Sequence, residues 1–581
     1  MAALVAFVTA PGGRAALVGD APDARPEGGA LGTSGPEAVG PVAELARRAA
    51  ELEAAGDVRW VWWSAGADAA ALAGAAVPVA RCWDVAEAHR LLAGGWEATP
   101  QVAWATARGL DRAGLPEATR GDLFDFDAAA PMPELSDVGL GRVVRPDGYL
   151  DPDAGTDGWH PDDDTLLAWA RTALECARAQ QSALAEVGPR AVAAARSESA
   201  AAFLCLELAR DGLPVDRATA EQMIAEAAGA RPTDEAHARR IRAERDTTVL
   251  RHTPGRETTD LRNPVQVKEL LASVGVVVPN TRKWVLEPFR DTHPVVDALL
   301  EWRKAERIAT TYGYPWLDAH VGPDDRLRGG WTACDGAAGR MTAQNGLHNL
   351  PTALRPAVAA HPGHLFVRAD LGQIEPRVLA AVSGDEAFAA ATRADDLYAP
   401  VAAALGVDRP VAKIAVLAAM YGQRSGAAGE ALKDLERTYP VAMGYLDAAY
   451  AAGLRREPLR TFGGRLIRLD AVLADVPAES AAAYDAARGR FARNAVIQGS
   501  AAELFKAWAA TVRATTRDLG AQIVLCLHDE LLVHVPAQHA EEARARLEQA
   551  LTDSARRWTG SSRVRFVADA SIIHRWSEAK D

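Results

Sequence analysis

The chain has 581 residues, a net charge of −13 at pH 7, 49% hydrophobic residues and 24% charged residues. This length predicts more than one domain with an ample core. Because no apolar run reaches the length of a membrane span and the start at Met1 lacks the basic lead of a signal peptide, we expect neither an anchor nor a leader. The five cysteines are scattered, odd in number and without a CxxC pattern. This pattern argues against a disulfide framework or a zinc site and favours a reducing cytoplasm.

The acidic excess lies in the first third of the chain. Residues 1–190 contain 15 Lys and Arg against 28 Asp and Glu, whereas residues 191–581 contain 49 of each sign. Affinity for nucleic acid depends on local cations that face phosphates, so the negative total does not exclude a nucleic-acid-binding protein.

The first third predicts a separate α/β domain. Apolar runs at residues 3–9 and 58–64 are typical of strands, and residues 85–92 are typical of a helix. A stretch at 121–164 is rich in Asp, Pro and Gly, which indicates an acidic loop or linker.

From about residue 191 the pattern becomes helical. Asn263 is placed to cap a helix that runs to Leu271. Residues 239–262 are dense in arginine, which is consistent either with a segment that binds a phosphate backbone or with a solvated charged helix. The sequence leaves both interpretations open.

Two later stretches each place a carboxylate at the end of a strand. Residues 365–370 form an apolar strand pattern that ends in Asp370, and two apolar runs within 522–536 flank a polar tip that contains Asp529, which predicts a hairpin. Two aspartates on neighbouring strand ends can hold two divalent cations for an in-line phosphoryl displacement, and carboxylate oxygens suit Mg²⁺. The alternative is that Asp529 lies in an ordinary solvated turn.

A helix is predicted between these two stretches, with Asp408 as its cap, Pro410 in its first turn and Gly422 at its end. The N-terminal part of this helix carries the cations Arg409 and Lys413, and its C-terminal part carries the apolar Leu417 and the aromatic Tyr421. This arrangement would suit a nucleoside triphosphate, with the cations at its phosphates and the ring at its base. The alternative is a surface helix with two basic residues. The stripe of side chains spaced four apart consists of Arg409, Lys413, Leu417 and Tyr421.

These segments resemble three motifs of the family A (polymerase I type) DNA polymerases. The pattern Asp370-x-x-Gln373-Ile-Glu375-x-Arg377 resembles motif A, residues 409–422 resemble motif B, and residues 528–530 (His-Asp-Glu) resemble motif C. The resemblance covers roughly residues 190–581. Supporting segments follow the family's order: Gly339-Arg340, Asn349-Leu350-Pro351, Ser383-Gly384-Asp385 and Asn494-x-x-x-Gln498-Gly499-Ser500.

The resemblance implies an α/β exonuclease-like domain of RNase H type, followed by a mixed α+β right-hand polymerase domain. The expected bounds are 1–189 for the exonuclease-like domain, 190–329 for the thumb, 330–385 and 500–581 for the two parts of the palm, and 386–499 for the fingers.

The implied activity is that of a DNA-directed DNA polymerase, which adds dNTPs to a primer 3′-hydroxyl in DNA repair or replication. Glu375 would exclude a ribose 2′-hydroxyl while bound to the Tyr421 hydroxyl, because a buried carboxylate needs a partner. Primer–template DNA and dNTPs are the expected partners. The protein is expected to be monomeric, bacterial, cytoplasmic and nucleoid-associated, without membrane contact.

The implied catalytic residues are Asp370, Asp529, Lys413 and Glu530, with two Mg²⁺ ions bound by Asp370 and Asp529. The implied nucleotide-binding residues are Arg409, Lys413, Tyr421, Glu375, Gln373 and Leu417. The implied DNA-binding residues are Arg340, Asn494, Gln498, His528 and Arg377.

In this family the first domain is a 3′–5′ exonuclease, which needs an Asp-x-Glu on the first strand and a late Tyr-x-x-x-Asp. Residues 1–190 contain no Asp-x-Glu. The single Tyr-x-x-x-Asp there, Tyr149 with Asp153, falls in the acidic loop rather than on a helix. We therefore expect an exonuclease-like fold without that activity, and no 5′-nuclease domain before it.

The chain departs from the family pattern at several positions, among them Leu371, Gly372 and Pro376 in motif A. Leu417 replaces an aromatic residue that stacks on the nucleotide, and Tyr398 replaces a phosphate-binding histidine. Loss of a ring can cost about 1 kcal/mol, so we expect a slower enzyme with unusual nucleotide selection. Two alternatives are a polymerase that retains exonuclease activity and a non-catalytic DNA-binding protein that keeps the fold.

Overall fold

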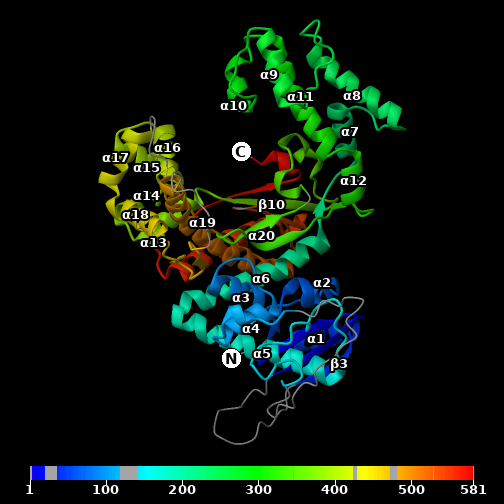
Figure 1. Ribbon diagram of the computed structural model, residues 1–581, viewed down its shortest axis with the longest axis vertical. Coiled ribbons are helices and arrows are strands. Elements are labelled where there is room, and N and C mark those ends of the chain that lie inside the picture. Colours follow the sequence, from blue (N-terminus) through cyan, green and yellow to red (C-terminus); the bar gives the residue numbers. More distant parts are fainter. Residues whose placement is uncertain are drawn as a thin grey trace, which may run out of the picture. The chain divides into compact units, whose positions relative to one another are not determined.

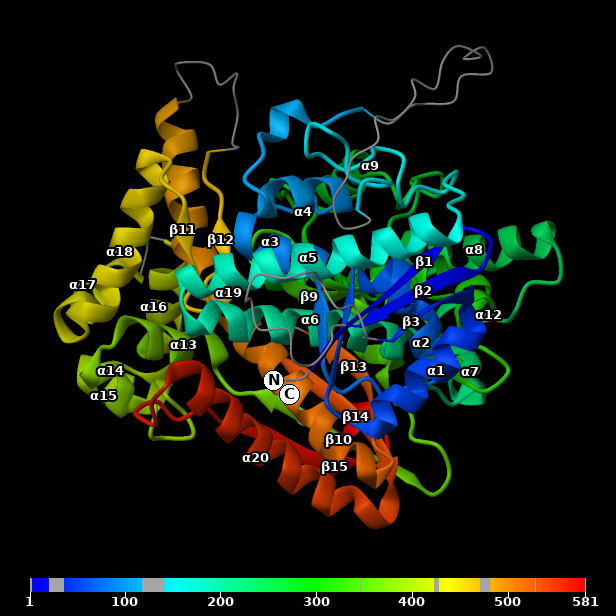
Figure 2. The same cartoon turned by 90° about the horizontal axis from the view of Figure 1, so that it is seen from below.

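The computed structural model describes residues 3–19, 36–117, 140–344, 346–422, 428–470, 481–527 and 529–579. The chain forms two compact units, whose elements are labelled in Figure 1 and seen from below in Figure 2. The first unit comprises Met1–Asp211, Gly330–Ala343 and Val367–Ile572. The second comprises Gly212–Gly329, Gln344–Phe366 and Ile573–Asp581.

The first unit begins with a mixed five-stranded sheet in the order β3-β2-β1-β4-β5. Strand β1 pairs antiparallel with β2 and parallel with β4, and its residues 5–8 are all buried. Such a continuous apolar run suits a central strand that is covered on both faces. The strands are β1 (Ala3–Ala10), β2 (Arg14–Gly19), β3 (Glu37–Pro41), β4 (Val58–Trp62) and β5 (Cys82–Asp84).

Helices pack against this sheet. Helix α5 lies along β1 and β2, as Figure 2 shows, and α6 contacts β5. The strands predicted at 3–9 and 58–64 and the helix predicted at 85–92 are confirmed. The helices are α1 (Val42–Ala55), α2 (Ala70–Gly74), α3 (Val85–Ala93), α4 (Pro100–Ala107), α5 (Asp163–Val187) and α6 (Pro189–Asp211).

A second sheet, in the order β13-β14-β10-β15, carries the two predicted carboxylates. The hairpin predicted at 522–536 is confirmed, and six consecutive residues of its second strand are buried. The long helix α19 (Ala481–Thr516) packs against α20 (Ala540–Thr559) and α6. The strands are β10 (His364–Leu371), β13 (Gln522–Leu527), β14 (Glu530–Pro536) and β15 (Ala568–Ile573).

Six further helices and two small hairpins complete the first unit. Helix α16 confirms the predicted helix: it ends at Gly422, whose φ of 69° suits a glycine, while Asp408 stands at the cap without a side-chain capping hydrogen bond. The helices are α13 (Ile374–Ser383), α14 (Glu386–Ala391), α15 (Tyr398–Leu405), α16 (Arg409–Tyr421), α17 (Ala428–Thr438) and α18 (Pro440–Arg455). The hairpins are β8 (Trp331–Asp335) with β9 (Arg340–Ala343), and β11 (Leu459–Arg460) with β12 (Leu466–Ile467).

A buried charged cluster joins α6 to α19. Glu198 on α6 forms ion pairs with Lys506 on α19 and with Arg465 after β11, the latter at 2.8 Å, and all three side chains are buried. Glu503 accepts hydrogen bonds from Thr461 and from the backbone N–H of Gly463. The N-terminal segment therefore shares an interior with the helix that supports the second sheet.

The second unit is mainly helical. Asn263 caps α9 as predicted, because its side chain accepts hydrogen bonds from the backbone N–H groups of Val265 and Gln266. In the arginine-rich segment, Arg245 and Arg262 both pair with Glu306. The elements are β6 (Leu213–Pro214), α7 (Arg217–Ala228), α8 (Glu235–Leu250), α9 (Pro264–Ser273), α10 (Lys283–Leu286), α11 (Pro294–Thr311), α12 (Tyr314–His320) and β7 (Arg326–Leu327).

The predicted domain bounds divide the chain more finely than these two units and stay a prediction. Helix α19 runs through the boundary predicted at 499/500. No helix in the described ranges is both long enough and apolar enough to cross a membrane.

Candidate active site

The two predicted carboxylates lie at adjacent strand ends. Asp370 is the penultimate residue of β10, and Asp529 lies in the turn between β13 and β14. The backbone N–H of Leu371 donates a 2.8 Å hydrogen bond to the backbone carbonyl of Asp529, which fixes the two turns together. Both carboxylates line one cleft of about 270 Å³.

An arginine that we did not predict lies beside them. Arg368 donates through Nε to Glu530 at 3.2 Å and through Nη2 to Asp370 at 3.4 Å. It precedes Asp370 by two residues on a strand, so the two side chains share one face. That spacing was a usable signal in the sequence. Glu530 is mostly buried beside the cleft.

The site carries unbalanced negative charge. Burial, together with the neighbouring Asp370 and Glu530 carboxylates, raises the pKa of Asp529 to about 7. Burial also raises the pKa of Asp370, against the opposing effect of Arg368. Facing carboxylates that resist ionisation in this way are stabilised by a bound cation.

The residues present fit a divalent cation. Carboxylate oxygens are the donors that Mg²⁺ prefers, and one or two of them suffice when substrate phosphates supply further ligands. Within the described ranges no group of three or more His, Cys, Asp and Glu residues is arranged to hold a metal. Asp370 and Asp529 are the two aspartates in the cleft lining that offer such oxygens.

A polar network forms one wall of the cleft. Glu375 accepts a 3.3 Å hydrogen bond from the Tyr421 hydroxyl, as predicted, and a 2.7 Å hydrogen bond from Arg340 Nη2. Gln498 on α19 is hydrogen-bonded to Tyr421. Burial raises the pKa of Glu375, while Arg340 and Tyr421 oppose that shift. The network joins four segments that are distant in the sequence.

The cleft gathers much of the predicted site. Leu417 and Tyr398, two of the departures from the family pattern, both lie in its wall. Burial, with Glu375 and Asp396 nearby, raises the pKa of Tyr398 to about 12, so its hydroxyl is neutral near pH 7. The predicted residues in the lining are Asp370, Asp529, Gln373, Glu375, Leu417, Tyr421, Arg340 and Gln498.

Arg409 is bound by an acid that sequence reasoning missed. Arg409 donates through Nε to Asp396 at 2.5 Å and through Nη2 at 3.3 Å. Gln373 also donates to Asp396, at 2.7 Å. These contacts connect positions 13 and 23 residues apart, and no local pattern marks Asp396.

The prediction that Arg377 contacts DNA is wrong. Its side chain is 0% exposed, and its guanidinium donates to the backbone carbonyls of residues 372, 392, 394, 395 and 565. Burial lowers the pKa of Arg377 to about 10. A side chain enclosed in this way organises the loop before α15 and cannot reach a ligand.

Of the three predicted residues not yet placed, two lie outside the cleft lining and one lies outside the described ranges. Lys413 is exposed on α16 and forms no ion pair with any described residue. Asn494 lies one helical turn from Gln498 on α19, and its buried Oδ1 has no hydrogen-bond partner in the described part of the chain. His528 is outside the described residues.

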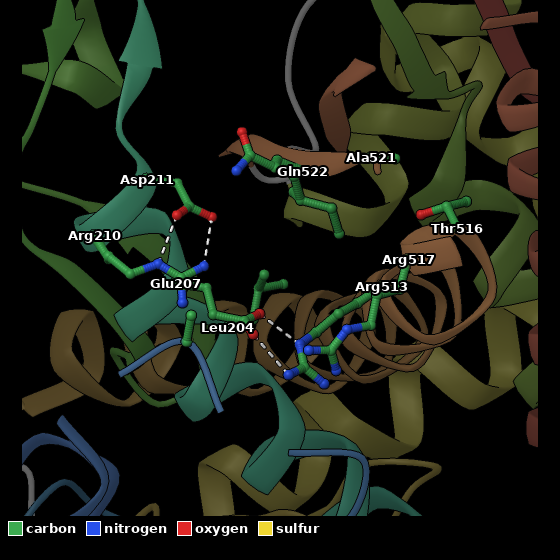
Figure 3. A pocket seen from close by; sticks show the side chains of 11 residues that line it. Leu204, Glu207, Arg210, Asp211, Arg513, Thr516, Arg517, Ala521 and Gln522 are labelled. Carbon is green, nitrogen blue, oxygen red and sulfur yellow. Dashed lines mark hydrogen bonds and ion pairs between the residues drawn. The ribbon is translucent and has the colours of Figure 1, made fainter. Parts of the chain in front are cut away.

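A second hollow, of about 130 Å³, lies where α6 and α19 end (Figure 3). Four of the charged side chains that line it form two ion pairs, Arg210 with Asp211 and Arg513 with Glu207, and Arg517 adds a third cation. Such internal pairing indicates a structural junction rather than the reaction site.

The family model for DNA polymerase family A matches residues 255–578, which is more than half of the chain. The chain belongs to DNA polymerase family A. Its similarity to curated family A enzymes includes 29% identity over 304 residues with the thermostable DNA polymerase I of Thermus filiformis, covering 47% of this chain and 36% of that protein. A DNA polymerase I of Chloroflexus aurantiacus is 32% identical over 298 residues, covering 46% of this chain and 31% of that protein. A DNA polymerase theta of Caenorhabditis elegans is 27% identical over 294 residues, covering 47% and 18% respectively. The chain thus matches about a third of the length of the bacterial relatives.

The fold also matches a solved family A structure. The polymerase domain of Pol1 from M. smegmatis, in complex with DNA primer-template and dNTP, superposes with a TM-score of 0.65 at 19% identity. The match covers 99% of this chain and 95% of that chain. The polymerase-domain fold is therefore confirmed.

Proposed function

We propose that this protein is a DNA-directed DNA polymerase, which adds dNTPs to the 3′-hydroxyl of a primer under the direction of a template strand. The observation that carries the proposal is the pairing of Asp370 and Asp529 at adjacent strand ends in one cleft, in a chain of family A. A protein that only binds DNA has no need for two facing carboxylates that resist ionisation.

The two aspartates would hold two Mg²⁺ ions, as the chemistry of the donor set allows. When bound, the ions supply charge stabilisation for the attacking and leaving oxygens of the displacement. The role of Asp370 and Asp529 would be to hold these ions in the cleft. Glu530 would keep Arg368 in place beside them.

The nucleotide would lie along α16. Arg409 and Lys413 would bind the triphosphate, with Lys413 also giving a proton to the leaving pyrophosphate. Leu417 and Tyr421 would face the base and sugar, and Glu375, held by Tyr421 and Arg340, would exclude a ribose 2′-hydroxyl. Gln373 would support Arg409 through Asp396.

Primer–template DNA would be bound through its minor groove. The groove offers acceptors on every base pair, so the polar side chains there can test pair shape without reading sequence. The residues assigned to this role are Arg340, Asn494, Gln498 and His528. In the M. smegmatis structure, primer-template DNA and dNTP are bound together, which supports both as partners here.

We further propose that the N-terminal sheet contributes no exonuclease activity. Strand β1 ends in Thr9-Ala10, without a carboxylate, and the nearby Asp68 is buried. Asp68 accepts hydrogen bonds from the backbone N–H groups of Thr9 at 2.8 Å and of Trp63 at 3.0 Å. Tyr149 lies in irregular backbone and Asp153 in a turn, so neither is on a helix. The Asp68 carboxylate is occupied by backbone hydrogen bonds, and Asp153 does not lie on a helix beside it, so these acids do not form the metal site of an exonuclease.

The direct test is the Asp529→Ala variant in a primer-extension assay. If the bound metal ions lower the activation free energy of extension by even roughly 5 kcal/mol, their loss lowers the extension rate more than a thousandfold. The variant should keep its fold, because removal of one of two facing carboxylates relieves repulsion, and its affinity for primer–template should change less than about threefold. The matched control is Asp518→Ala, since Asp518 is 64% exposed and pairs with Arg546. Near-normal extension by Asp529→Ala would refute the assignment.

A further inference from the structure

Asp396 lies in the loop between α14 and α15, outside the residues assigned above to nucleotide, metal or DNA. Its carboxylate accepts hydrogen bonds from four donors. Two of these donors belong to Arg409, the third is the Gln373 side chain at 2.7 Å, and the fourth is the backbone N–H of Tyr398 at 3.2 Å. An acid with this many donors is held in one position.

The loop that carries Asp396 is fixed from two sides. Arg377, fully buried on α13, donates to the carbonyls of Thr392, Ala394 and Asp395. Gln373 accepts a 2.8 Å hydrogen bond from the backbone N–H of Leu397, so both ends of its amide bind this loop. Gln373 itself has a φ of 56°, a left-handed conformation that non-glycine residues adopt at some energetic cost. Asp396 is therefore placed relative to the turn that follows Asp370.

Asp396 leaves most of the Arg409 guanidinium available. A guanidinium has five N–H donors in a planar fork, and Asp396 takes the Nε donor and one Nη2 donor. The other three form no hydrogen bond within the described ranges, and the side chain is half exposed. The guanidinium carbon lies 5.8 Å from the centroid of the Tyr398 ring, and Tyr398 lines the cleft. The free donors are thus held next to the proposed nucleotide site.

We propose that Asp396 is a positioning residue for the triphosphate: it orients Arg409 so that the free edge of its guanidinium binds the phosphates of the incoming dNTP. This inference rests on the proposed function. It assigns to Gln373 and Arg377 the task of placing Asp396, which explains why both bind the same loop.

Neutralising Asp396 would change the KM for dNTP in opposite directions, depending on whether its negative charge or its orientation of Arg409 matters more. An Asp396→Asn substitution removes a negative charge from the neighbourhood of a polyanion, so charge alone predicts tighter nucleotide binding and a lower KM. Loss of orientation predicts weaker binding, because a free arginine side chain gives up rotamer entropy when it binds. If orientation dominates, KM for dNTP rises about tenfold, which is the effect of one charge-assisted hydrogen bond.

The experiment is steady-state incorporation of a single dNTP by the full chain. For Asp396→Asn we expect KM for dNTP to rise about tenfold, with kcat within about twofold of the wild type. The matched control is Asp395→Asn at the adjacent position, where the carboxylate is 84% exposed and pairs with Arg565. This control should leave KM unchanged.

A double-mutant cycle separates positioning from a general structural effect. In an Arg409→Ala background, Asp396→Asn should raise KM no further, since the side chain that Asp396 orients is gone. An additive effect, or an unchanged or lowered KM in the single variant, would overturn the inference. If Asp396→Asn does not fold, Asp396→Glu is measured in its place, and its displaced carboxylate should also raise KM. A wild-type chain that incorporates no nucleotide would instead refute the proposed function.

Discussion

Replacing Glu198 by alanine tests whether the N-terminal segment is built into the polymerase core. Glu198 is 1% exposed and pairs with Lys506 and Arg465, which are also buried. The neighbouring Glu503 has a pKa raised to about 7 by burial, so near pH 7 it supplies only part of the missing negative charge. The variant therefore leaves two buried cations facing one partly protonated carboxyl.

Removal of one partner from a buried ion pair costs about 3–5 kcal/mol, and fuller ionisation of Glu503 places the expected cost near the lower end. A loss of about 3 kcal/mol lowers the apparent Tm by on the order of 5 °C. The assay is thermal unfolding followed by circular dichroism. The matched control is Glu541→Ala, in which a 76% exposed glutamate loses its pair with Arg544, at a cost below about 1 kcal/mol. Equal, small Tm shifts for the two variants would refute the reasoning.

Three further predictions concern the cleft and its supports. Glu375→Ala should lower discrimination against ribonucleotides by roughly tenfold or more, measured as the ratio of kcat/KM values for dNTP and rNTP, and an unchanged ratio would contradict the sugar-gate assignment. Burial raises the folded-state pKa of Glu503 to about 7, so the cost of ionising this side chain in the folded protein is absent below about pH 4.5 and complete above about pH 7. The free energy of unfolding, measured with urea, should therefore fall by about 3 kcal/mol as the pH rises through this window, and Glu503→Gln should make it less dependent on pH. Arg377→Met should lower the apparent Tm and leave the Kd for primer–template unchanged, since its donors bind backbone carbonyls rather than DNA; a weakened Kd with an unchanged Tm would reinstate the original prediction.

The positions of Asp370 and Asp529 could be predicted because their signal is local. An apolar strand that ends in a carboxylate, and a hairpin with an acidic tip, place Asp370 and Asp529 at strand ends whatever the rest of the chain does. The hydrogen bond between Glu375 and Tyr421 was also predictable, since a buried carboxylate needs a partner and α16 offers a hydroxyl.

Other parts of the site depend on the tertiary fold. A motif gives the position of Arg377 but not its burial, which is set by the loop that folds over α13. Asp396 meets Arg409 and Gln373 only because that loop returns to the end of β10, and no periodicity signals this contact. The charged cluster around Glu198 likewise joins helices some 300 residues apart in the sequence.

One gel tests the central claim most directly. A 5′-labelled primer annealed to a longer template is incubated with the protein and Mg²⁺, with and without dNTPs, and the products are resolved under denaturing conditions. The account predicts primer growth with dNTPs, no growth when Mg²⁺ is chelated, and no shortening without dNTPs. Absence of growth under every condition would contradict the proposed polymerase activity, and shortening without dNTPs would contradict the proposal that the N-terminal sheet lacks exonuclease activity.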